Sequence, residues 1–440
     1  MGLKKYRKYY ILLTSLILLV VIGILIFFQV QSRRMSRLLL IVSPISAGEN
    51  HSLAIMDDGR LFSWGSNQSG QLGTGTTIDK LIPIFVMDNI ISVSTGGSGS
   101  FVGTGYSLAI TMDNVLIGWG SAFLGQLGIG GRSGGHSGGG RALWPPFTPL
   151  NEPRINDISG RLGAWGTLDP VRIKNSVIHV SAGSSHSVSI RGDGRLFGWG
   201  SNRNLSHPSR GLPSSNTFRW RDIATPFRQR GSQIVRFPEP MMDNIIYVSA
   251  GTNHTLAITK DNDLLGWGSN ELGQIGDFAS TSNLREVKIM QNIISVSAGG
   301  NHTVAIKYDG SLWTWGANQY SQLGNGEELY GLNYFPTEGE DRIYWRTPVQ
   351  GGSMPIQIME NIKRVSSGVN YIMAITNDGD IWAWGANQFG QLGDGTIENR
   401  ISPIFIMNNV AYVSAGVNHT LAIRKDGSLW SWGNNNYGQL

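Results

Sequence analysis

Five histidines stand in nearly identical local sequences and are the first residues to consider for chemistry: His51, His186, His254, His302 and His419. Neutral imidazole acts as a general base and is a common metal ligand. Tyr106 and Tyr371 occupy the same local sequence twice more, and neighbouring copies lie at least 48 residues apart. Side chains distributed one per repeat cannot converge on a single ion. We therefore expect each histidine to hydrogen-bond within its own β-sheet.

Two short motifs resemble functional sequences by letter only. Residues 131–135 match GxSxG, but they lie in the glycine-rich run GIGGRSGGHSGGGR, without the strand and helix of a nucleophile elbow. Asp57 and Asp58 precede Gly59 as in some calcium loops, yet the remaining ligand spacing is absent and a hairpin turn explains them. The chain has no cysteine, which excludes thiolate nucleophiles and cysteine-ligated metals. We predict no catalytic residue, no cofactor, no metal site and no enzymatic activity.

Residues 203–236 have the composition of a contact surface. They include seven arginines against one acid, Asp222, with aromatic residues between them. Arginine and tryptophan are enriched at interface hot spots, and the same mixture suits an acidic partner or anionic lipid headgroups. The candidate partner-binding residues here are Arg210, Phe218, Arg219, Trp220, Arg221, Phe227, Arg228 and Arg230.

Residues 327–352 contain five acids beside aromatic residues and so have the opposite character. The candidate contact residues in this stretch are Tyr330, Tyr334, Phe335, Tyr344 and Trp345. Two interpretations stay open. The two stretches pair with each other or carry solvated charge, or they bind a partner protein.

All these residues sit on or between copies of one repeated unit, best seen at residues 410–440 as VAYVSAGVNHTLAIRKDGSLWSWGNNNYGQL. A Trp-Gly pair marks each of seven copies, at Trp64, Trp119, Trp199, Trp267, Trp315, Trp384 and Trp432. Each copy spells short strands joined by turns such as Asp309-Gly310, in which glycine accepts a positive φ. Four strands per copy make one blade. The predicted fold is all-β: a seven-bladed β-propeller of four-stranded antiparallel blades.

The unit resembles the repeat of the regulator of chromosome condensation family. The shared features are a Ser-Ala-Gly turn, Asn-His-Thr or Asn-His-Ser, an Asp-Gly hairpin, Trp-Gly and Gly-Gln-Leu-Gly, as in SAGENHSLAI from Ser46 and SAGTNHTLAI from Ser249. The resemblance covers residues 42–440 and implies a seven-bladed ring. The best-known activity of the family is nucleotide exchange on the small nuclear GTPase Ran, which the fold alone does not imply.

Three spacings between Trp-Gly pairs exceed the basic period, and in each the extra residues follow the turn after Trp-Gly. These insertions cover about residues 129–168, 203–236 and 327–352. Their common point of insertion predicts that they emerge on one face of the ring. Long loops grouped on one rim of a rigid scaffold are the usual place for recognition.

The chain begins with a basic tail (residues 1–10), an uncharged apolar stretch (residues 11–30) and a short linker (residues 31–34). A helix of that length, rising ~1.5 Å per residue, spans a ~30 Å hydrocarbon core. Basic residues follow directly where a cleaved signal peptide has small ones, so we predict an uncleaved transmembrane signal-anchor helix before the propeller. Residues 1–37 carry seven basic residues and no acid, which leaves −2 of the net +5 for the remainder. We therefore expect no nucleic-acid binding.

The propeller is predicted to span residues 35–440. The last copy reaches Leu440 before the stretch that supplies the fourth strand in other copies. Aligning residues 42–48 with residues 410–416 places residues 35–41 where that strand should lie, so we expect residues 35–41 to close the ring. The alternative, a chain that continues beyond Leu440 in a longer protein, stays open.

Four glycosylation sequons fall at the same tight turn of the repeat, beginning at Asn50, Asn253, Asn301 and Asn418. Glycans there would obstruct blade packing, which disfavours a eukaryotic lumen. The slight excess of basic charge before the apolar stretch favours a cytoplasmic tail. We therefore favour a single-pass membrane protein whose propeller lies outside the cytoplasm of a bacterial cell, with the opposite topology left open.

The predicted function is a membrane-anchored, non-enzymatic scaffold that binds an unidentified protein partner through the insertions on one face. The alternative is a nucleotide exchange factor, or another regulatory factor, for a small GTPase. That alternative requires the propeller to face the cytoplasm.

Overall fold

The computed structural model describes residues 43–97, 104–129, 162–163, 166–201, 234–276, 282–326 and 354–440. The chain divides into two units, residues 1–42 and residues 43–440, and every described residue belongs to the second. The predicted membrane helix at residues 11–30 and the predicted closing strand at residues 35–41 lie outside the described residues. Within the described ranges, no helix is long and apolar enough to cross a membrane.

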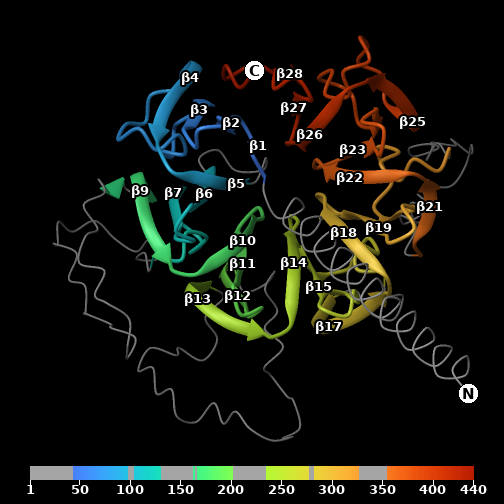
Figure 1. Cartoon of the computed structure of the whole chain (residues 1–440), viewed down its shortest axis with the longest axis horizontal. Coiled ribbons are helices and arrows are strands. Elements are labelled where there is room, and N and C mark those ends of the chain that lie inside the picture. The colour runs from blue at the N-terminus through green and yellow to red at the C-terminus, as the bar shows by residue number, and fades with distance from the viewer. Residues whose placement is uncertain are drawn as a thin grey trace, which may run out of the picture. The chain divides into compact units, whose positions relative to one another are not determined.

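The described strands form seven antiparallel sheets that follow one another along the chain as the blades of a ring (Figure 1). Blade 1 comprises β1 (Ile45–Ala47), β2 (His51–Ile55), β3 (Leu61–Gly65) and β4 (Lys80–Met87). Blade 2 comprises β5 (Ile90–Gly96), β6 (Tyr106–Thr111), β7 (Leu116–Ser121), β8 (Leu162–Gly163) and β9 (Gly166–Lys174). Blade 3 comprises β10 (Val177–Ala182), β11 (His186–Arg191), β12 (Leu196–Ser201) and β13 (Ile234–Met242).

The second half of the ring repeats this order. Blade 4 comprises β14 (Ile245–Ala250), β15 (His254–Thr259), β16 (Leu264–Ser269) and β17 (Ser282–Met290). Blade 5 comprises β18 (Ile293–Ala298), β19 (His302–Lys307), β20 (Leu312–Gly316) and β21 (Ile356–Met359). Blade 6 comprises β22 (Ile362–Ser367), β23 (Tyr371–Thr376), β24 (Ile381–Gly385) and β25 (Arg400–Met407). Blade 7 comprises β26 (Val410–Ala415), β27 (His419–Arg424) and β28 (Leu429–Gly433).

The predicted seven-bladed propeller is confirmed. Consecutive strands pair in every sheet, except that the short β8 adds a fifth strand outside β9 in blade 2. The sheet of blade 7 has three strands among the described residues.

The hairpin between the second and third strands shows why the repeat folds as it does. In blade 5, His302 pairs with Gly316 and Ile306 with Leu312. The connecting turn places Gly310 at φ +82°, in the left-handed region that favours glycine. The predicted role of the Asp-Gly pairs as hairpin turns is therefore confirmed.

The apolar cores lie between neighbouring blades. Trp199 of blade 3, for example, packs in one cluster with Tyr106 and Leu108 of blade 2. All but the last of the seven Trp-Gly tryptophans are at most 1% exposed. Since each core draws side chains from two sheets, no blade can bury its apolar faces alone.

A belt of serines links the innermost strands of successive blades. One serine hydroxyl in each blade accepts a hydrogen bond, at 2.9–3.0 Å, from a main-chain N–H of the next blade. The last of these bonds joins the Ala47 N–H of blade 1 to Ser414 Oγ of blade 7, so the ring closes within the described residues. This serine belt comprises Ser46, Ser94, Ser181, Ser249, Ser297, Ser366 and Ser414.

Candidate functional site

One face of the ring carries both the Ser-Ala-Gly turns and the points where the predicted insertions leave the blades. In every blade, the residue after Trp-Gly donates its N–H to a carbonyl of the turn between the first and second strands, as Ser66 does to Asn50 at 2.8 Å. The third and fourth strands then meet at this same end. Ser121 pairs with Gly166 around the first insertion, and Ser201 pairs with Ile234 around the second. We call this side of the ring the insertion face.

The residues that the sequence singles out for partner binding lie outside the described residues. This holds for the arginines and aromatic residues of the stretch 203–236 and for the aromatic residues of the stretch 327–352. The GxSxG match at residues 131–135 also lies outside them. Their candidate role therefore stays a prediction, and the described geometry defines only where the chain leaves and rejoins the ring.

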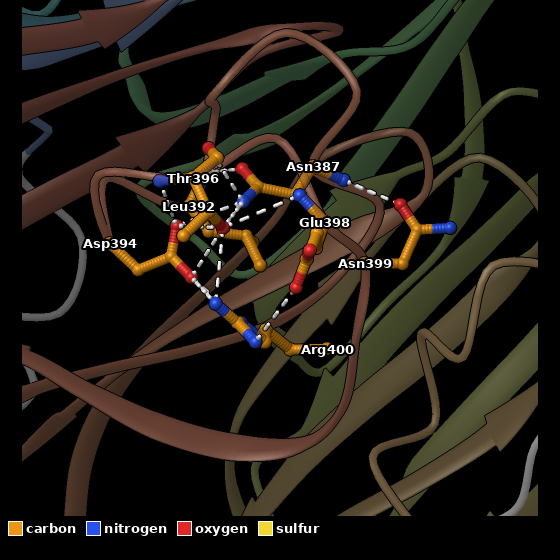
Figure 2. Close-up of polar contacts among 7 residues, drawn as sticks. All are labelled: Asn387, Leu392, Asp394, Thr396, Glu398, Asn399 and Arg400. Atoms are coloured by element: carbon orange, nitrogen blue, oxygen red, sulfur yellow. Dashed lines mark hydrogen bonds and ion pairs between the residues drawn. The ribbon is translucent and has the colours of Figure 1, made fainter.

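Blade 6 shows how the turn after Trp-Gly is held together where it carries no long insertion (Figure 2). Asn387 accepts the Leu392 N–H on Oδ1 at 2.9 Å and donates from Nδ2 to Asp394 Oδ1 at 2.9 Å. Arg400 Nε donates to Asp394 Oδ2 at 2.7 Å. Burial alone would raise the pKa of Asp394, but bonds from Arg400, Thr396 and Asn387 lower it overall. These hydrogen bonds hold the blade 6 turn together.

Four of the five recurring histidines bond to the next blade rather than within their own sheet, so the expectation that each bonds within its own sheet is wrong. All five are fully buried. His51 Nε2 of blade 1 lies 3.0 Å from Ser107 Oγ of blade 2, and His419 Nε2 of blade 7 lies 3.0 Å from Ser52 Oγ of blade 1. Tyr106 and Tyr371 place their hydroxyls in the same way, 3.0 Å from the hydroxyl of the next blade. We call these contacts the histidine belt.

The hydroxyl partner shows which nitrogen of the imidazole carries a proton, and burial determines the charge of the ring. Ser107 donates its hydroxyl hydrogen to the carbonyl oxygen of Gln71 at 2.8 Å, so it can only accept from His51. The His51 ring therefore carries a proton on Nε2. Burial lowers the pKa from 6.5 to about 3 for His51, His254 and His302 and to about 4 for His186 and His419. These histidines are structural groups that stay neutral at physiological pH.

A third set of contacts, the tryptophan belt, uses the same glutamine carbonyls. Indole Nε1 donates to the main-chain oxygen of a glutamine in the preceding blade, at 2.8–3.1 Å, from Trp64, Trp119, Trp199, Trp315, Trp384 and Trp432. The glutamine is that of the Gly-Gln-Leu-Gly turn or of its variants, such as Gly-Gln-Ile-Gly at Gln274 and Ser-Gln-Leu-Gly at Gln322. That recurrent motif is therefore a docking point between blades.

Two of the three belts are each interrupted once among the described residues. His302 Nε2 has no hydrogen-bond partner, because Ile372 of blade 6 stands where the other blades carry serine or threonine. Trp267 Nε1 also has no partner. Blade 3, which precedes it, lacks the Gly-Gln-Leu-Gly turn in its sequence.

The turns at the Ser-Ala-Gly positions of all seven blades, which read Ser-Thr-Gly in blade 2 and Ser-Ser-Gly in blade 6, surround a small cavity at the centre of the insertion face. Its volume is about 100 Å³, and Glu49 is the one charged residue among the described residues that line it. Thr104 Oγ1 lies 3.4 Å from Glu49 Oε2. Burial raises the pKa of Glu49 to about 7, and the bond from Thr104 opposes this only in part. We call this cavity the central mouth.

The interior of the ring also carries side chains that break the repeat. His179 and Tyr247 stack at 4.6 Å between ring centroids, and the Arg364 guanidinium carbon lies 4.5 Å from the ring centre of Tyr412. Arg364 and Tyr247 belong to blades 6 and 4, which are not neighbours, yet each affects the pKa of the other. Their side chains therefore lie within electrostatic range of each other.

The described residues offer no cluster of three or more histidine, aspartate or glutamate side chains suited to a metal ion. The sequence did not predict a role for Glu49, nor for the interior residues His179, Tyr247, Arg364 and Tyr412. Alignment of the copies contains the signal for Glu49: the other six have glycine, serine, threonine or valine after the Ser-Ala-Gly turn.

Two models of the Regulator of chromosome condensation (RCC1) repeat match the chain. One matches residues 58–102, 261–306, 309–375 and 378–423. The other matches residues 41–71, 177–204, 245–274, 293–322, 362–391 and 410–439. Together they cover well over half of the chain.

Among curated proteins, the Arabidopsis thaliana ultraviolet-B receptor UVR8 is 30% identical over 263 residues, which are 53% of this chain and 54% of UVR8. The human E3 ubiquitin-protein ligase HERC2 is 27% identical over 240 residues, 52% of this chain but 4% of HERC2. The chain thus spans about half of the first relative and a small part of the second.

Two solved structures share the fold. Human WBSCR16 superposes with a TM-score of 0.60 at 19% identity, covering 87% of each chain. Yeast RCC1 (Prp20), in its complex with Kap60, superposes with a TM-score of 0.62 at 17% identity, covering 91% of this chain and 81% of Prp20. At this level of identity the likeness shows the fold alone.

Proposed function

Because the chain belongs to the Regulator of chromosome condensation (RCC1) repeat family, we propose that it is a non-enzymatic scaffold that binds a protein partner through its insertion face. One observation carries the proposal. The described residues that flank the predicted insertions lie at one end of the blades, on a ring closed by side-chain and main-chain bonds. A rigid ring with variable loops on one rim is suited to recognition.

The composition of the insertions supports the same function. The stretch 203–236 combines arginine with aromatic residues. Arginine forms bidentate hydrogen bonds with carboxylates, and aromatic side chains bury well at interfaces. We propose that this stretch makes the main contact with an acidic surface of the partner, with the aromatic residues of stretch 327–352 beside it.

We also propose that residues 11–30 anchor the protein in a membrane as a single helix, with the propeller outside the cytoplasm. The apolar length and the basic residues before it support the anchor. The position of the four sequons supports a bacterial cell surface, although the relatives named above come from a plant and an animal.

The test replaces residues 210–230 with a glycine-serine linker in the full chain. Proteins cross-linked to the intact protein in cells should be lost from this variant, while its melting temperature stays unchanged. The control variant replaces residues 330–345 in the same way and should lose fewer of them. Cross-linked partners that persist in the 210–230 variant would refute the proposal.

The second candidate is regulation of a small GTPase, which the family membership favours. A study of yeast Prp20p, whose structure resembles this chain at 18% identity, concerns its binding to Gsp1p and histones. This candidate requires the propeller to face the cytoplasm. Protease treatment of intact cells distinguishes the two, because an external propeller is cleaved and a cytoplasmic one is protected.

A further inference from the structure

The central mouth is sized for one side chain. A cavity needs ~10–15 Å³ of water-accessible space to hold one water, and pockets for drug-sized ligands enclose ~300–1,000 Å³. At about 100 Å³, the mouth holds a few waters or the head group of a single residue. It is formed by turns from all seven blades, so it is fixed by the closure of the ring rather than by any one loop.

The groups around the mouth are mostly hydrogen-bond acceptors. Four carbonyl oxygens of the lining turns, those of Gly48, Gly183, Gly251 and Gly299, each accept a hydrogen bond of 3.1–3.4 Å from the adjacent turn. A carbonyl oxygen has two lone pairs, so those of Gly48, Gly251 and Gly299 can accept a second bond, whereas that of Gly183 already accepts one from the Tyr106 hydroxyl at 3.0 Å. A ligand that presents several N–H groups matches this lining better than an anion does.

The charge of the mouth points to the same kind of ligand. The carboxylate of Glu49 is the one charge among the described lining residues, and its burial, which raises its pKa to about 7, disfavours the charged form. A cation placed beside it would remove this penalty and form a charge-assisted bond. Sequence positions equivalent to Glu49 carry no charge in the other six blades, so a bound cation would have one defined counter-ion, on the blade 1 side of the mouth.

We propose that the central mouth receives one lysine or arginine side chain of a protein partner, with the Glu49 carboxylate as its counter-ion. This inference rests on the proposed recognition function of the insertion face. It adds a single anchoring residue at the axis, where a protruding side chain meets seven turns at once.

The test measures binding of Nα-acetyl-arginine methylamide to the full chain by calorimetry at pH 8, where Glu49 is ionised. Acetyl-citrulline methylamide, which has the same shape but no charge, should bind at least about tenfold more weakly, as expected for loss of a charge-assisted bond. Glu49→Gln should cause a similar loss. Glu271→Gln, which neutralises an exposed acid in the blade 4 turn, should cause none.

The arginine probe should also lower the pH at which Glu49 takes up a proton. Equal binding of the citrulline and arginine probes, or unchanged binding in Glu49→Gln, would overturn the assignment. Complete displacement of the probe by potassium chloride, compared with choline chloride at the same ionic strength, would assign the mouth to an inorganic cation instead. These small probes report on the mouth alone, so their failure would leave the 210–230 replacement test untouched.

Discussion

The serine belt and the histidine belt hold the same blades together but respond differently to change. The serine belt is complete around the ring and uses a main-chain N–H as its donor. The histidine belt needs a matched pair of side chains in neighbouring blades, and one substitution, Ile372, interrupts it. A contact with one variable partner survives sequence drift better than a contact with two. Three changes test the contributions of the two belts experimentally.

Acid should weaken the histidine belt and spare the serine belt, and this is the largest effect we expect. The folded histidines stay neutral down to a pKa of about 3 or about 4, whereas the unfolded chain takes up protons near pH 6.5. Stability is therefore full above pH 6.5 and falls as the pH drops toward 4. At pH 5.5, one unit below the pKa of histidine in the unfolded chain, each of the five histidines lowers the free energy of unfolding by about 1 kcal/mol, which makes several kcal/mol together. Melting temperatures between pH 7.5 and 4.5 measure this loss.

Two features check the assignment of this pH dependence. Glu49 acts in the opposite direction, since its raised pKa favours the folded state as the pH falls from about 7, but it is one group against five. His254→Gln keeps a donor for Thr303 and removes one titrating ring. It should flatten the dependence by about a fifth. An unchanged slope in this variant would contradict the prediction.

Gly251→Ala should destabilise the ring at a turn that contacts both belts. A Cβ at this position would lie 2.6 Å from the Gly299 carbonyl oxygen and 2.6 Å from His254 Cε1. Neither group can move away without breaking a bond to the neighbouring blade, so we expect the free energy of unfolding, measured by urea denaturation, to fall by about 1–3 kcal/mol. Gly192→Ala is the matched control, because its nearest atom lies 3.8 Å away. Equal stability of the two variants would argue against tight contact between the turns.

Ile372→Thr should repair the interrupted histidine belt. The new hydroxyl can accept from His302 Nε2 and donate to the Gln322 carbonyl, which already accepts from Trp384 at 3.1 Å. Ile372→Val is the control, since valine and threonine have nearly the same shape and both lose one methylene. We expect the threonine variant to be more stable than the valine variant by about 1–2 kcal/mol, because it gains two hydrogen bonds. A buried threonine normally destabilises relative to valine, so the usual order would refute the repair.

The number of blades and their hairpins could be predicted because the residues that determine each hairpin lie within a single copy of the repeat. Trp-Gly, Asp-Gly and the alternating strands are local features, and Gly310 adopts the positive φ that its turn requires. The role of the histidines could not be predicted from one copy. Their partner, such as Ser107 for His51, is 56 residues away in the next blade. It becomes visible only when two copies are laid side by side in space.

Glu49 and Arg364 illustrate a second reason for failure. Both stand at positions where the copies differ, so they do not form part of the shared repeat pattern. Their significance comes from the ring, which brings residues from all blades to one axis. The predicted contact residues of stretches 203–236 and 327–352 show the opposite case, because composition alone marked them and the described residues do not test them.

The missing hydrogen bonds of the histidine and tryptophan belts also predict where the ring should open locally. The junction between blades 5 and 6 lacks its histidine bond and the junction between blades 3 and 4 lacks its tryptophan bond. The junction between blades 7 and 1, which are not consecutive in the chain, keeps all three: Ala47 to Ser414, His419 to Ser52 and Trp64 to the Gln439 carbonyl. Transient local opening should therefore begin inside the repeat array, and the seam between the first and last blades should be among the last places to admit solvent.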